Sequence, residues 1–428
     1  MFSGSSLRLA CADAAGRIYE HSWLRPAGRA GNELISLTAS HLIPLPRGAT
    51  LTSLPGRWAL GVTAGGRFQR ARSLPGVRGP LFAVGALLPM GFARTFLPAA
   101  FASKQAQPLP LFGYTAVAFC GGQLYAAALQ VEPDNTTWDP RHFNTPDLPE
   151  RVNQLCSCYP QNRILKQLAH CALNYGCFTA QNIFYRRWEG GVPVSPACNA
   201  RCVGCISKQV SECCPSSQKR IAFVPTEIEI VEVAVPHLAE AEKAIISFGQ
   251  GCEGEPTLVG TQLERAIRAV RERTERGVIN INTNGSRPRV VKNLARAGLR
   301  SIRVSLLSPQ PDVFAAYVRP RGYSLADVRE TLKVARGEGL ALSLNYLIFP
   351  GVSDREEEVE ALVDLLRECP VDQIQLRNLN IDPGIYQRAV PPRRGRLLGI
   401  EELLATLRRE FPTLLLGSFT HTPGPTAP

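Results

Sequence analysis

The second half of the chain alternates short apolar runs with amphipathic segments, and this alternation limits the possible folds more than any other feature. The runs expected to form strands are a first one near Gly191–Ser195 and then Ala244–Phe248, Val278–Asn282, Ser301–Leu306, Leu340–Phe349 and Gln373–Arg377. The segments expected to form helices are Gln262–Thr274, Arg289–Ala297, Leu325–Gly337, Glu356–Arg367 and Ile400–Phe411. Strands that alternate with helices build a parallel sheet. About six such units fall short of the eight of a closed barrel, so the sequence predicts an α/β fold with a partial (β/α)6 barrel and a site at the carboxyl ends of its strands.

The first part of the chain has a different pattern, in which glycine and proline separate short apolar runs. Two of these runs, Gly113–Phe119 and Gln123–Val131, lie on either side of a Gly-Gly pair, which predicts a β-hairpin. We expect three parts: a smaller β-rich N-terminal domain over 1–131, a linker and cysteine-containing helical segment over 132–190, and the partial barrel over 191–428.

Composition limits where such a chain works. Its 428 residues are 45% apolar and 20% charged, as in an ordinary globular protein with more than one core. The N-terminus lacks the basic start and apolar run of a secretory signal, and Pro89 and Arg94 interrupt the most apolar stretch, Pro80–Ala102. We therefore expect a cytoplasmic protein without a membrane partner, whose 13 cysteines are metal ligands, catalytic thiols or core residues rather than disulfides.

The formal net charge of +12 is compatible with an anionic partner such as nucleic acid. Many arginines, however, lie beside glutamate in the expected helices, as in Arg271-Glu272-Arg273, and no block of five or more basic residues occurs. A solvated surface of mixed charge is the favoured interpretation.

A group of three cysteines, Cys198, Cys202 and Cys205, follows the first expected strand directly. Three thiolates on one loop can bind three irons of a cubane cluster and leave the fourth iron open. A structural zinc site is the alternative, but such a site normally needs four ligands at paired spacing.

This spacing and position resemble the radical S-adenosylmethionine superfamily, whose hallmark is a CxxxCxxC loop after the first strand of a partial barrel. The resemblance covers residues 191–390. It implies a [4Fe-4S] cluster at the three cysteines, with S-adenosylmethionine bound to the open iron through its methionine amino and carboxylate groups. It also implies that an electron from a reductant such as flavodoxin or ferredoxin cleaves the cofactor to a 5'-deoxyadenosyl radical, which abstracts hydrogen from the substrate.

Later elements match the family's pattern in order. Gly254-Glu255-Pro256 matches the end of a GGEP element that contacts the methionine amino group, although Glu253 replaces its first glycine. Thr283-Asn284-Gly285 matches a TNG turn, and Ser305 ends the fourth strand. The cofactor-binding residues implied in this way are Gly254, Glu255, Pro256, Asn284, Ser305, Asn345 and Arg377. Because a β-carbon at Gly254 would block close approach of the backbone to the cofactor, we expect Gly254→Val to weaken cofactor binding and leave cluster assembly intact.

Several of these positions have a second interpretation. Ser305, Asn345 and Asn378 could be hydrogen-bonding residues at strand ends without a ligand. Arg319 and Arg377 could bind a carboxylate or phosphate, or form structural ion pairs.

Two further positions depart from the family pattern. Asp354, in a weak match to the family's adenine-side element, is interpreted as a helix N-cap. Gly204 stands where many members have an aromatic residue that packs on adenine, so another group must hold the adenine here.

Six further cysteines lie just before the barrel or just after the cysteine loop: Cys156, Cys158, Cys171, Cys177, Cys213 and Cys214. Some of them could hold an auxiliary iron-sulfur cluster, and buried free thiols are the alternative. Cys252 could handle substrate or fill space. No catalytic residue is identified.

The function expected from these observations is reductive cleavage of S-adenosylmethionine for hydrogen abstraction from an unidentified peptide, tRNA or small metabolite. The alternative is a non-catalytic metal-binding interaction protein that binds RNA through its positive charge. Salt-dependent RNA affinity would favour the latter.

Overall fold

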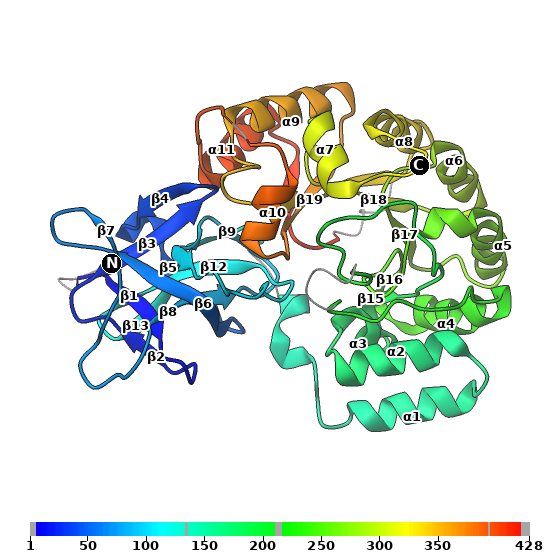
Figure 1. Cartoon of the computed structure of the whole chain (residues 1–428). Helices are drawn as coiled ribbons and strands as arrows, with labels where there is room; N and C mark the ends of the chain where they lie inside the picture. Colours follow the sequence, from blue (N-terminus) through cyan, green and yellow to red (C-terminus); the bar gives the residue numbers. More distant parts are fainter. Residues whose placement is uncertain (1–5, 133–135, 210–215, 393, 421–428) are drawn as a thin grey trace.

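The computed structural model describes residues 6–132, 136–209, 216–392 and 394–420. An antiparallel β region made by the first part of the chain lies beside a curved parallel sheet with helices around its outer side (Figure 1). The predicted fold class, a partial (β/α)6 barrel preceded by a β-rich N-terminal region, is confirmed.

The parallel sheet contains seven strands in the order of the sequence. They are β15 (Arg187–Gly191), β16 (Glu242–Phe248), β17 (Val278–Thr283), β18 (Ser301–Leu306), β19 (Ala341–Ile348), β20 (Gln373–Asn378) and β21 (Leu415–Gly417). β18 has the predicted bounds, whereas β15 begins at Arg187, inside the expected linker, so the first strand was placed too late. β21 was not predicted, because a strand of three residues is too short to show a period.

Eight α-helices of the described residues follow β15. They are α4 (Glu227–Glu240), α5 (Gly260–Arg271), α6 (Pro288–Ala297), α7 (Pro311–Val318), α8 (Leu325–Gly337), α9 (Glu356–Glu368), α10 (Pro383–Ala389) and α11 (Ile400–Glu410). The sequence predicted α8 with its observed bounds, because Ser324 and Asp327 form a capping box at its start. It missed α4, which has Pro236 in its interior, where proline usually ends a helix. It also missed α7 and α10, which have only 8 and 7 residues.

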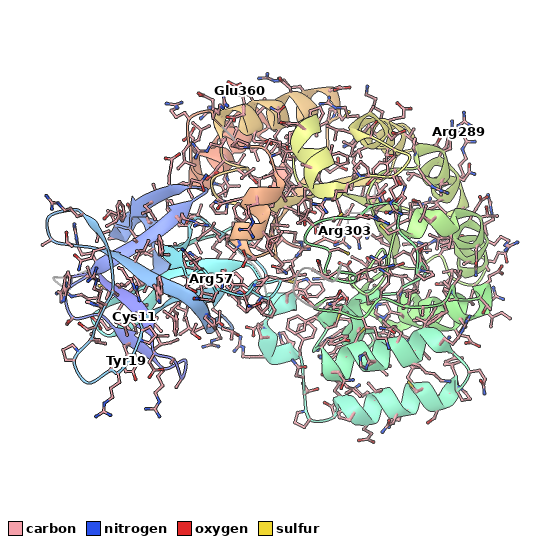
Figure 2. All side chains as sticks on the ribbon, in the orientation of Figure 1. Cys11, Tyr19, Arg57, Arg289, Arg303 and Glu360 are labelled. Atoms are coloured by element: carbon pink, nitrogen blue, oxygen red, sulfur yellow. The ribbon has the colours of Figure 1, made fainter. Side chains whose placement is uncertain are left out.

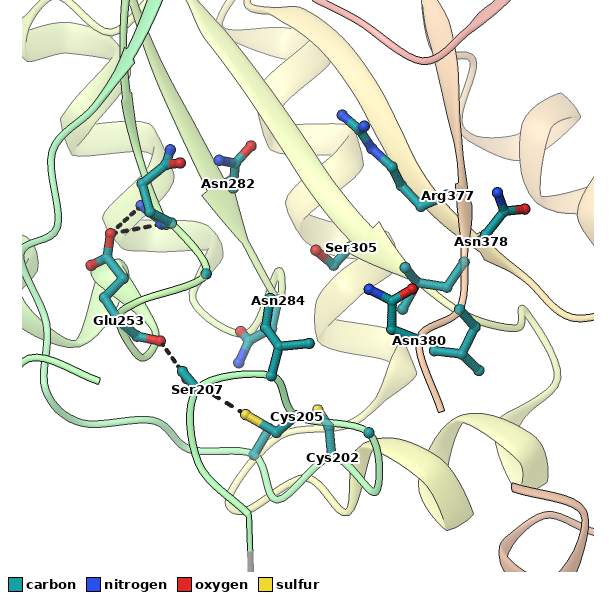
Figure 3. A pocket seen from close by; sticks show the side chains of 18 of the residues that line it. Cys202, Cys205, Ser207, Glu253, Asn282, Asn284, Ser305, Arg377, Asn378 and Asn380 are labelled. Atoms are coloured by element: carbon teal, nitrogen blue, oxygen red, sulfur yellow. Dashed lines mark hydrogen bonds between the residues drawn. The ribbon is translucent and has the colours of Figure 1, made fainter. Parts of the chain in front are cut away.

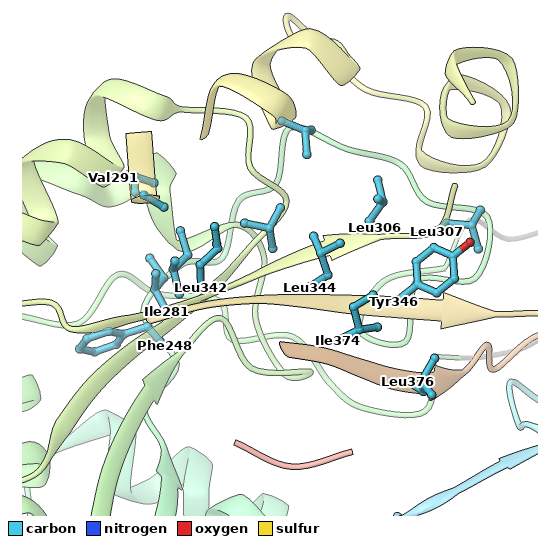
Figure 4. Packing of buried hydrophobic residues seen from close by; sticks show 14 of the residues in the cluster. Phe248, Ile281, Val291, Leu306, Leu307, Leu342, Leu344, Tyr346, Ile374 and Leu376 are labelled. Atoms are coloured by element: carbon cyan, nitrogen blue, oxygen red, sulfur yellow. The ribbon is translucent and has the colours of Figure 1, made fainter. Parts of the chain in front are cut away.

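Alternation along the barrel strands separates the apolar core from a polar interior. Ile302, Val304 and Leu306 of β18 belong to the core that packs against the helices (Figure 4). Arg303 and Ser305 point the other way, as successive residues of a strand do, and both line a cavity. Figure 2 shows Arg303 within the barrel, in contrast to residues on the outer helices. The inner face of the sheet is therefore polar and available for chemistry.

The N-terminal region is antiparallel throughout. Its strands are β1 (Arg8–Ala12), β2 (Ile18–Glu20), β3 (Arg25–Ala30), β4 (Glu33–Ser36), β5 (Ile43–Pro44), β6 (Thr50–Val62), β7 (Phe68–Arg70), β8 (Phe82–Leu87), β9 (Phe92–Arg94), β10 (Leu97–Pro98), β11 (Ala100–Ala102), β12 (Tyr114–Cys120), β13 (Gln123–Ala126) and β14 (Ala128–Gln130). The predicted hairpin is formed by β12 and β13 with Gly121 and Gly122 between them, both at positive φ.

Between the two regions lie three helices, α1 (Leu148–Cys158), α2 (Arg163–Asn174) and α3 (Phe178–Tyr185). α3 packs on the first barrel strand, where Asn182 Nδ2 donates to the Glu189 carbonyl at 3.0 Å. The Ile183 side chain leaves no room for a β-carbon at Gly190. The helix α3 of this segment thus packs directly against the first strand of the barrel.

Buried polar contacts fasten the N-terminal region to the barrel. Arg94 is fully buried and donates to the Leu379 carbonyl at 2.9 Å. Asn378, at the end of β20, accepts from the Arg94 amide at 2.9 Å and donates to the Phe92 carbonyl at 2.9 Å. Asn378 therefore has the structural role that was one of its two interpretations. No helix in the described part of the chain combines the length and apolar character needed to cross a membrane.

Candidate active site

The three cysteines of the CxxxCxxC loop line one cavity of about 500 Å³ at the carboxyl ends of the barrel strands. We call it the mouth cavity, and Figure 3 shows Cys202 and Cys205 below the ends of the strands that carry Asn282 and Ser305. Cys198, Cys202 and Cys205 are all partly buried. Burial raises the pKa of the Cys202 thiol to about 12, so iron binding at this position would displace a proton.

The three cysteine thiols line the same cavity. Among the described residues no three His, Cys, Asp or Glu side chains are arranged to hold a single metal ion. A cubane instead binds each thiolate at a separate corner. Binding of one cluster by all three thiolates requires that they share a cavity, as Cys198, Cys202 and Cys205 do.

Backbone hydrogen bonds hold the cysteine loop from two sides. On one side the Arg201 and Val203 amides each donate at 3.0 Å to the carbonyls of Val318 and Tyr317, at the end of α7. On the other side the Glu255 amide donates to the Ala197 carbonyl at 2.8 Å. The loop is therefore fixed in shape by the barrel.

Gly254 lies where this second contact is tightest. Its amide donates to the Ser195 carbonyl at 2.7 Å, and a β-carbon would lie 1.9 Å from the Ala197 carbonyl oxygen and 3.2 Å from the Cys198 nitrogen. The structure changes the expectation for a larger residue here. Such a residue would displace the cysteine loop itself, so cluster assembly would be affected together with cofactor binding.

Glu253, which replaces the first glycine of the GGEP element, has a structural role. Its buried carboxylate accepts from the amides of Val194 and Ser195 at 2.8 and 3.0 Å and from those of Gly249 and Gln250 at 2.7 and 2.8 Å. Burial raises the pKa of this carboxyl to about 7, although the four donors lower it. Glu253 joins the chain after β15 to the turn after β16, which a glycine could not do.

Glu255 connects the same turn to the end of β17. Its carboxylate accepts from the Thr283 hydroxyl at 2.6 Å and from the Asn284 amide at 2.8 Å. The Asn284 side chain in turn donates to Asn199 Oδ1 in the cysteine loop at 2.8 Å. The three motifs that the sequence analysis treated separately thus form one hydrogen-bonded network at the mouth cavity.

Gly204 has a neighbour that explains the missing aromatic residue. A β-carbon at Gly204 would lie 2.7 Å from the hydroxyl oxygen of Tyr317, a buried residue of α7 that lines the mouth cavity. Only a glycine before Cys205 leaves room for this ring. Sequence reasoning missed Tyr317, because it is more than one hundred residues away from the loop and no local pattern connects the two.

The predicted cofactor-binding residues are distributed over two cavities. Gly254, Glu255, Asn284 and Ser305 line the mouth cavity, and Asn345 lines a second cavity inside the barrel. Ser305 and Arg377 line both cavities. A further set of residues lines neither cavity. Pro256 is buried at the start of the 3-10 helix Pro256–Val259, and Arg319 is exposed at the C-cap of α7.

Asp354 is not the N-cap that was expected, since Arg355 occupies that position of α9. The Asp354 carboxylate is buried and accepts instead from the Gly351 amide at 2.6 Å. Burial raises the pKa of Asp354 to about 6. The residue stabilises the tight turn after β19, which explains the cap-like sequence.

Among the other cysteines, Cys171 and Cys252 form a side-chain hydrogen bond that raises the pKa of Cys252, and burial together with the nearby Cys171 thiol raises the pKa of Cys177. Cys158 is exposed, Cys171 is buried and accepts from Gln167 Nε2 at 3.2 Å, and Cys156 donates to the Leu165 carbonyl at 4.0 Å. Cys177 lines the second cavity. Cys213 and Cys214 lie outside the described residues. Cys171, Cys177 and Cys252 therefore lie near one another, and the burial of Cys171 and Cys252 is compatible with packed free thiols.

The N-terminal region also contributes to the mouth cavity, which sequence reasoning did not foresee. Leu88, Pro89, Met90, Gly91 and Phe92, between β8 and β9, line it. The contact that brings them there is the Arg94 and Asn378 junction, which depends on tertiary packing alone.

Arg220 is a second residue that the sequence analysis missed. Its Nη2 donates to the Cys205 sulfur at 3.4 Å, and its Nε donates to the Ser207 hydroxyl at 3.0 Å. The Ser207 hydroxyl donates to the Glu253 carbonyl at 3.1 Å. A cation held against a cluster thiolate favours the reduced, more negative form of a cluster.

We expect Arg220→Gln to make the reduction potential of a reconstituted cluster more negative by on the order of 60 mV, the one-electron equivalent of about 1.4 kcal/mol for a lost charged hydrogen bond. An anaerobic redox titration followed by electron paramagnetic resonance measures it. Arg201→Gln is the matched control, because Arg201 is an exposed residue of the same loop. An equal shift in both variants would mean that general charge, and not the hydrogen bond, sets the potential.

The fold and the site together define a class of protein. Its members have an open parallel βα barrel with a loop of three cysteines at the carboxyl ends of the strands. Residues 192–375 match the family model described as the radical SAM superfamily. The parallel-sheet part of the chain therefore belongs to the radical SAM superfamily, and the resemblance in the sequence is confirmed. This family uses a [4Fe-4S] cluster and S-adenosylmethionine.

Curated relatives match part of the chain. GTP 3',8-cyclase of Marinobacter nauticus is 30% identical over 181 residues, 42% of this chain and 50% of that protein. GTP 3',8-cyclase of Clostridium acetobutylicum is 26% identical over 238 residues, 52% of this chain and 64% of that protein. The chain thus spans less than two thirds of the length of these relatives.

Solved structures are similar to part of the chain. Coproporphyrinogen III oxidase from Escherichia coli, a radical SAM enzyme, is 21% identical with a TM-score of 0.33, over 43% of this chain and 44% of that chain. Methylornithine synthase is 13% identical with a TM-score of 0.37, over 62% of this chain and 78% of that chain.

Proposed function

We propose that this chain is a radical SAM enzyme that reductively cleaves S-adenosylmethionine and uses the product for hydrogen abstraction from a substrate. The observation that carries the proposal is the single mouth cavity lined by Cys198, Cys202 and Cys205 and by the loop at Gly254. Cys198, Cys202 and Cys205 would hold the cluster, which would supply one electron for reductive cleavage of S-adenosylmethionine to methionine and a 5'-deoxyadenosyl radical. The protein's part is to hold, orient and shield these groups.

The three thiols would hold the cluster, and the opposite wall would hold the cofactor. Gly254, Asn284 and Ser305 present backbone and neutral polar groups to the mouth cavity, which suits the polar ends of S-adenosylmethionine. Glu255 is already saturated by Thr257, Thr283 and Asn284. It is therefore a positioning residue that sets the distance between this wall and the cysteine loop.

Apolar side chains shield the remaining wall of the mouth cavity. Those from the N-terminal region are Leu88, Met90 and Phe92, and those from the barrel are Leu347, Leu376 and Leu379. A site that forms a reactive intermediate has to exclude side reactions with solvent. The β8–β9 segment is therefore proposed to protect the chemistry, and this gives the N-terminal region a role in catalysis.

The proposal includes a reductant such as flavodoxin or ferredoxin and a reducing compartment such as the cytoplasm, where thiols stay available for iron. The substrate is a separate question, because the GTP 3',8-cyclases match only part of the chain. The non-catalytic alternative gains nothing from the site. A pure interaction module does not need a metal loop joined to a network at the strand ends.

Anaerobic reconstitution of the full chain tests the proposal. We expect at least one [4Fe-4S] cluster by iron, sulfide and spectroscopic analysis, and 5'-deoxyadenosine when dithionite and S-adenosylmethionine are added without substrate. A cluster-loaded protein that binds S-adenosylmethionine and forms no 5'-deoxyadenosine under strong reductant would contradict the proposed activity. Tightly bound zinc in place of iron would favour the interaction protein instead.

A further inference from the structure

A second cavity, of about 480 Å³, lies inside the barrel. We call it the lumen cavity. It shares part of its wall with the mouth cavity, and the residues common to both are Met90, Gly249, Gln250, Gly251, Asn282, Ser305 and Arg377. A volume of several hundred cubic ångströms is that of a small-molecule site. A molecule bound there would lie directly beside the proposed cofactor.

The lumen cavity is lined by more positive than negative side chains. Its charged lining residues are Glu189, Arg303 and Arg377. Glu189 and Arg303 form a buried ion pair, and the Glu189 carboxylate also accepts from the Ser247 and Thr420 hydroxyls at 2.6 and 3.0 Å. The single carboxylate is therefore fully used by Arg303 and two hydroxyls.

Arg377 has neutral partners. Its Nε donates to Asn345 Oδ1 at 3.2 Å and its Nη2 donates to Gln375 Oε1 at 3.0 Å. Gln375 Oε1 also accepts from Arg303 Nη1 at 3.3 Å, so two guanidinium groups share one amide oxygen. Burial lowers the pKa of Arg377 to about 10, which leaves it charged at neutral pH. The lumen cavity thus carries one positive charge that no described side chain balances.

The guanidinium of Arg377 is also placed to meet a ligand. No hydrogen bond joins its Nη1 to any part of the chain that the structure describes, and the side chain lines both cavities. Figure 3 shows Arg377 extending from its strand with its guanidinium directed away from the cysteine loop. Asn345 and Gln375 hold the other two nitrogens, so the free nitrogen is oriented before any ligand arrives.

Part of the wall of the lumen cavity is aromatic. Trp138, Phe178 and Phe419 line it, and the rings of Trp138 and Phe419 stack at 5.6 Å between centroids. A rigid aromatic wall favours a flat apolar group.

We infer that the lumen cavity binds the substrate, and that this substrate is a small molecule with an anionic carboxylate or phosphate group at one end and a flat apolar body at the other. Arg377 binds the anionic group and the aromatic wall receives the body. Placing a carboxylate or phosphate against a guanidinium is favourable because charge-assisted hydrogen bonds in a partly buried site are strong. The statement that the bound molecule is the substrate rests on the proposed function. The statement that the cavity binds an anion does not.

Binding of small probes to the full chain tests the inference. Phenylacetate and phenyl phosphate present the two anionic groups on a flat body, and phenylacetamide is the neutral control. Calorimetry is done on the protein with and without reconstituted cluster. We expect at least one of the anions to bind more than tenfold more tightly than phenylacetamide, and Arg377→Met to remove that preference, because a charged hydrogen bond of about 1.4 kcal/mol or more is tenfold in affinity.

Arg319→Met is the matched control, since Arg319 lies outside both cavities, and it should leave probe affinity unchanged. Arg377→Lys keeps the charge and should retain part of the preference, which separates a folding defect from loss of the anion site. Equal affinity for anion and amide, or anion binding that survives Arg377→Met, would overturn the inference. So would a loss of S-adenosylmethionine affinity in Arg377→Met with probe binding retained, because Arg377 would then hold the cofactor.

The two proposals can fail separately. If the cluster-loaded protein forms no 5'-deoxyadenosine but binds the anionic probes through Arg377, the proposed activity fails and the anion site stands. If 5'-deoxyadenosine forms and the probes do not bind, the activity stands and the substrate class is wrong.

Discussion

Cys202→Ser is expected to abolish both the [4Fe-4S] signal of the reconstituted protein and the formation of 5'-deoxyadenosine. A hydroxyl replaces a soft thiolate that iron strongly prefers. The loss should be close to complete, since two thiolates cannot present three corners of a cubane. Iron and sulfide content, the visible spectrum and product chromatography measure the two effects.

Cys158→Ser is the matched control, because Cys158 is exposed at the end of α1 and should keep the cluster and the activity. The triple variant Cys198→Ala, Cys202→Ala, Cys205→Ala tests the auxiliary cluster. If Cys156, Cys158, Cys171 and Cys177 are free thiols, of which Cys171 is buried and hydrogen-bonded to Cys252, the variant should retain almost no iron. Retention of about four irons per chain would show a second cluster. A Cys202→Ser protein with an unchanged spectrum would remove this loop from the metal site.

Gly254→Ala is expected to lose most of the cluster together with affinity for S-adenosylmethionine. Even a methyl group would lie 1.9 Å from the Ala197 carbonyl oxygen, far inside van der Waals contact, and neither backbone can give way without breaking the hydrogen bonds at Ser195 and Ala197. The cysteine loop must therefore move. Iron content after reconstitution and calorimetric titration of S-adenosylmethionine measure the result.

Gly337→Ala serves as control for Gly254→Ala. Gly337 lies in the last turn of α8, where a β-carbon meets no atom within 4 Å, and alanine there should be neutral or stabilising because it has the higher helix propensity. If Gly254→Ala assembles a normal cluster and loses cofactor affinity alone, the contact that matters is the one with the cofactor, as the sequence analysis expected.

Much of the barrel could be predicted because its signals are local. β18 and α8 were predicted with their observed bounds. The apolar residues of a strand or an amphipathic helix form a recognisable pattern within a short stretch of sequence. The same holds for the three cysteines, because a loop that binds one cluster needs its ligands close together in the sequence. α4 and β21 were missed, since an internal proline hides the first and the second has three residues.

The sequence by itself determined the fold class, the cysteine loop and the order of the family elements, because each depends on residues near one another in the chain. Only the tertiary structure decided what Glu253, Tyr317 and Arg220 do, because their partners lie on other elements. It also decided that the N-terminal region covers the mouth cavity, and that Arg303 has a carboxylate partner whereas Arg377 has amides. The net charge of a buried cavity depends on which strands face each other across it. Strands face each other only after the sheet has curved and brought distant residues together.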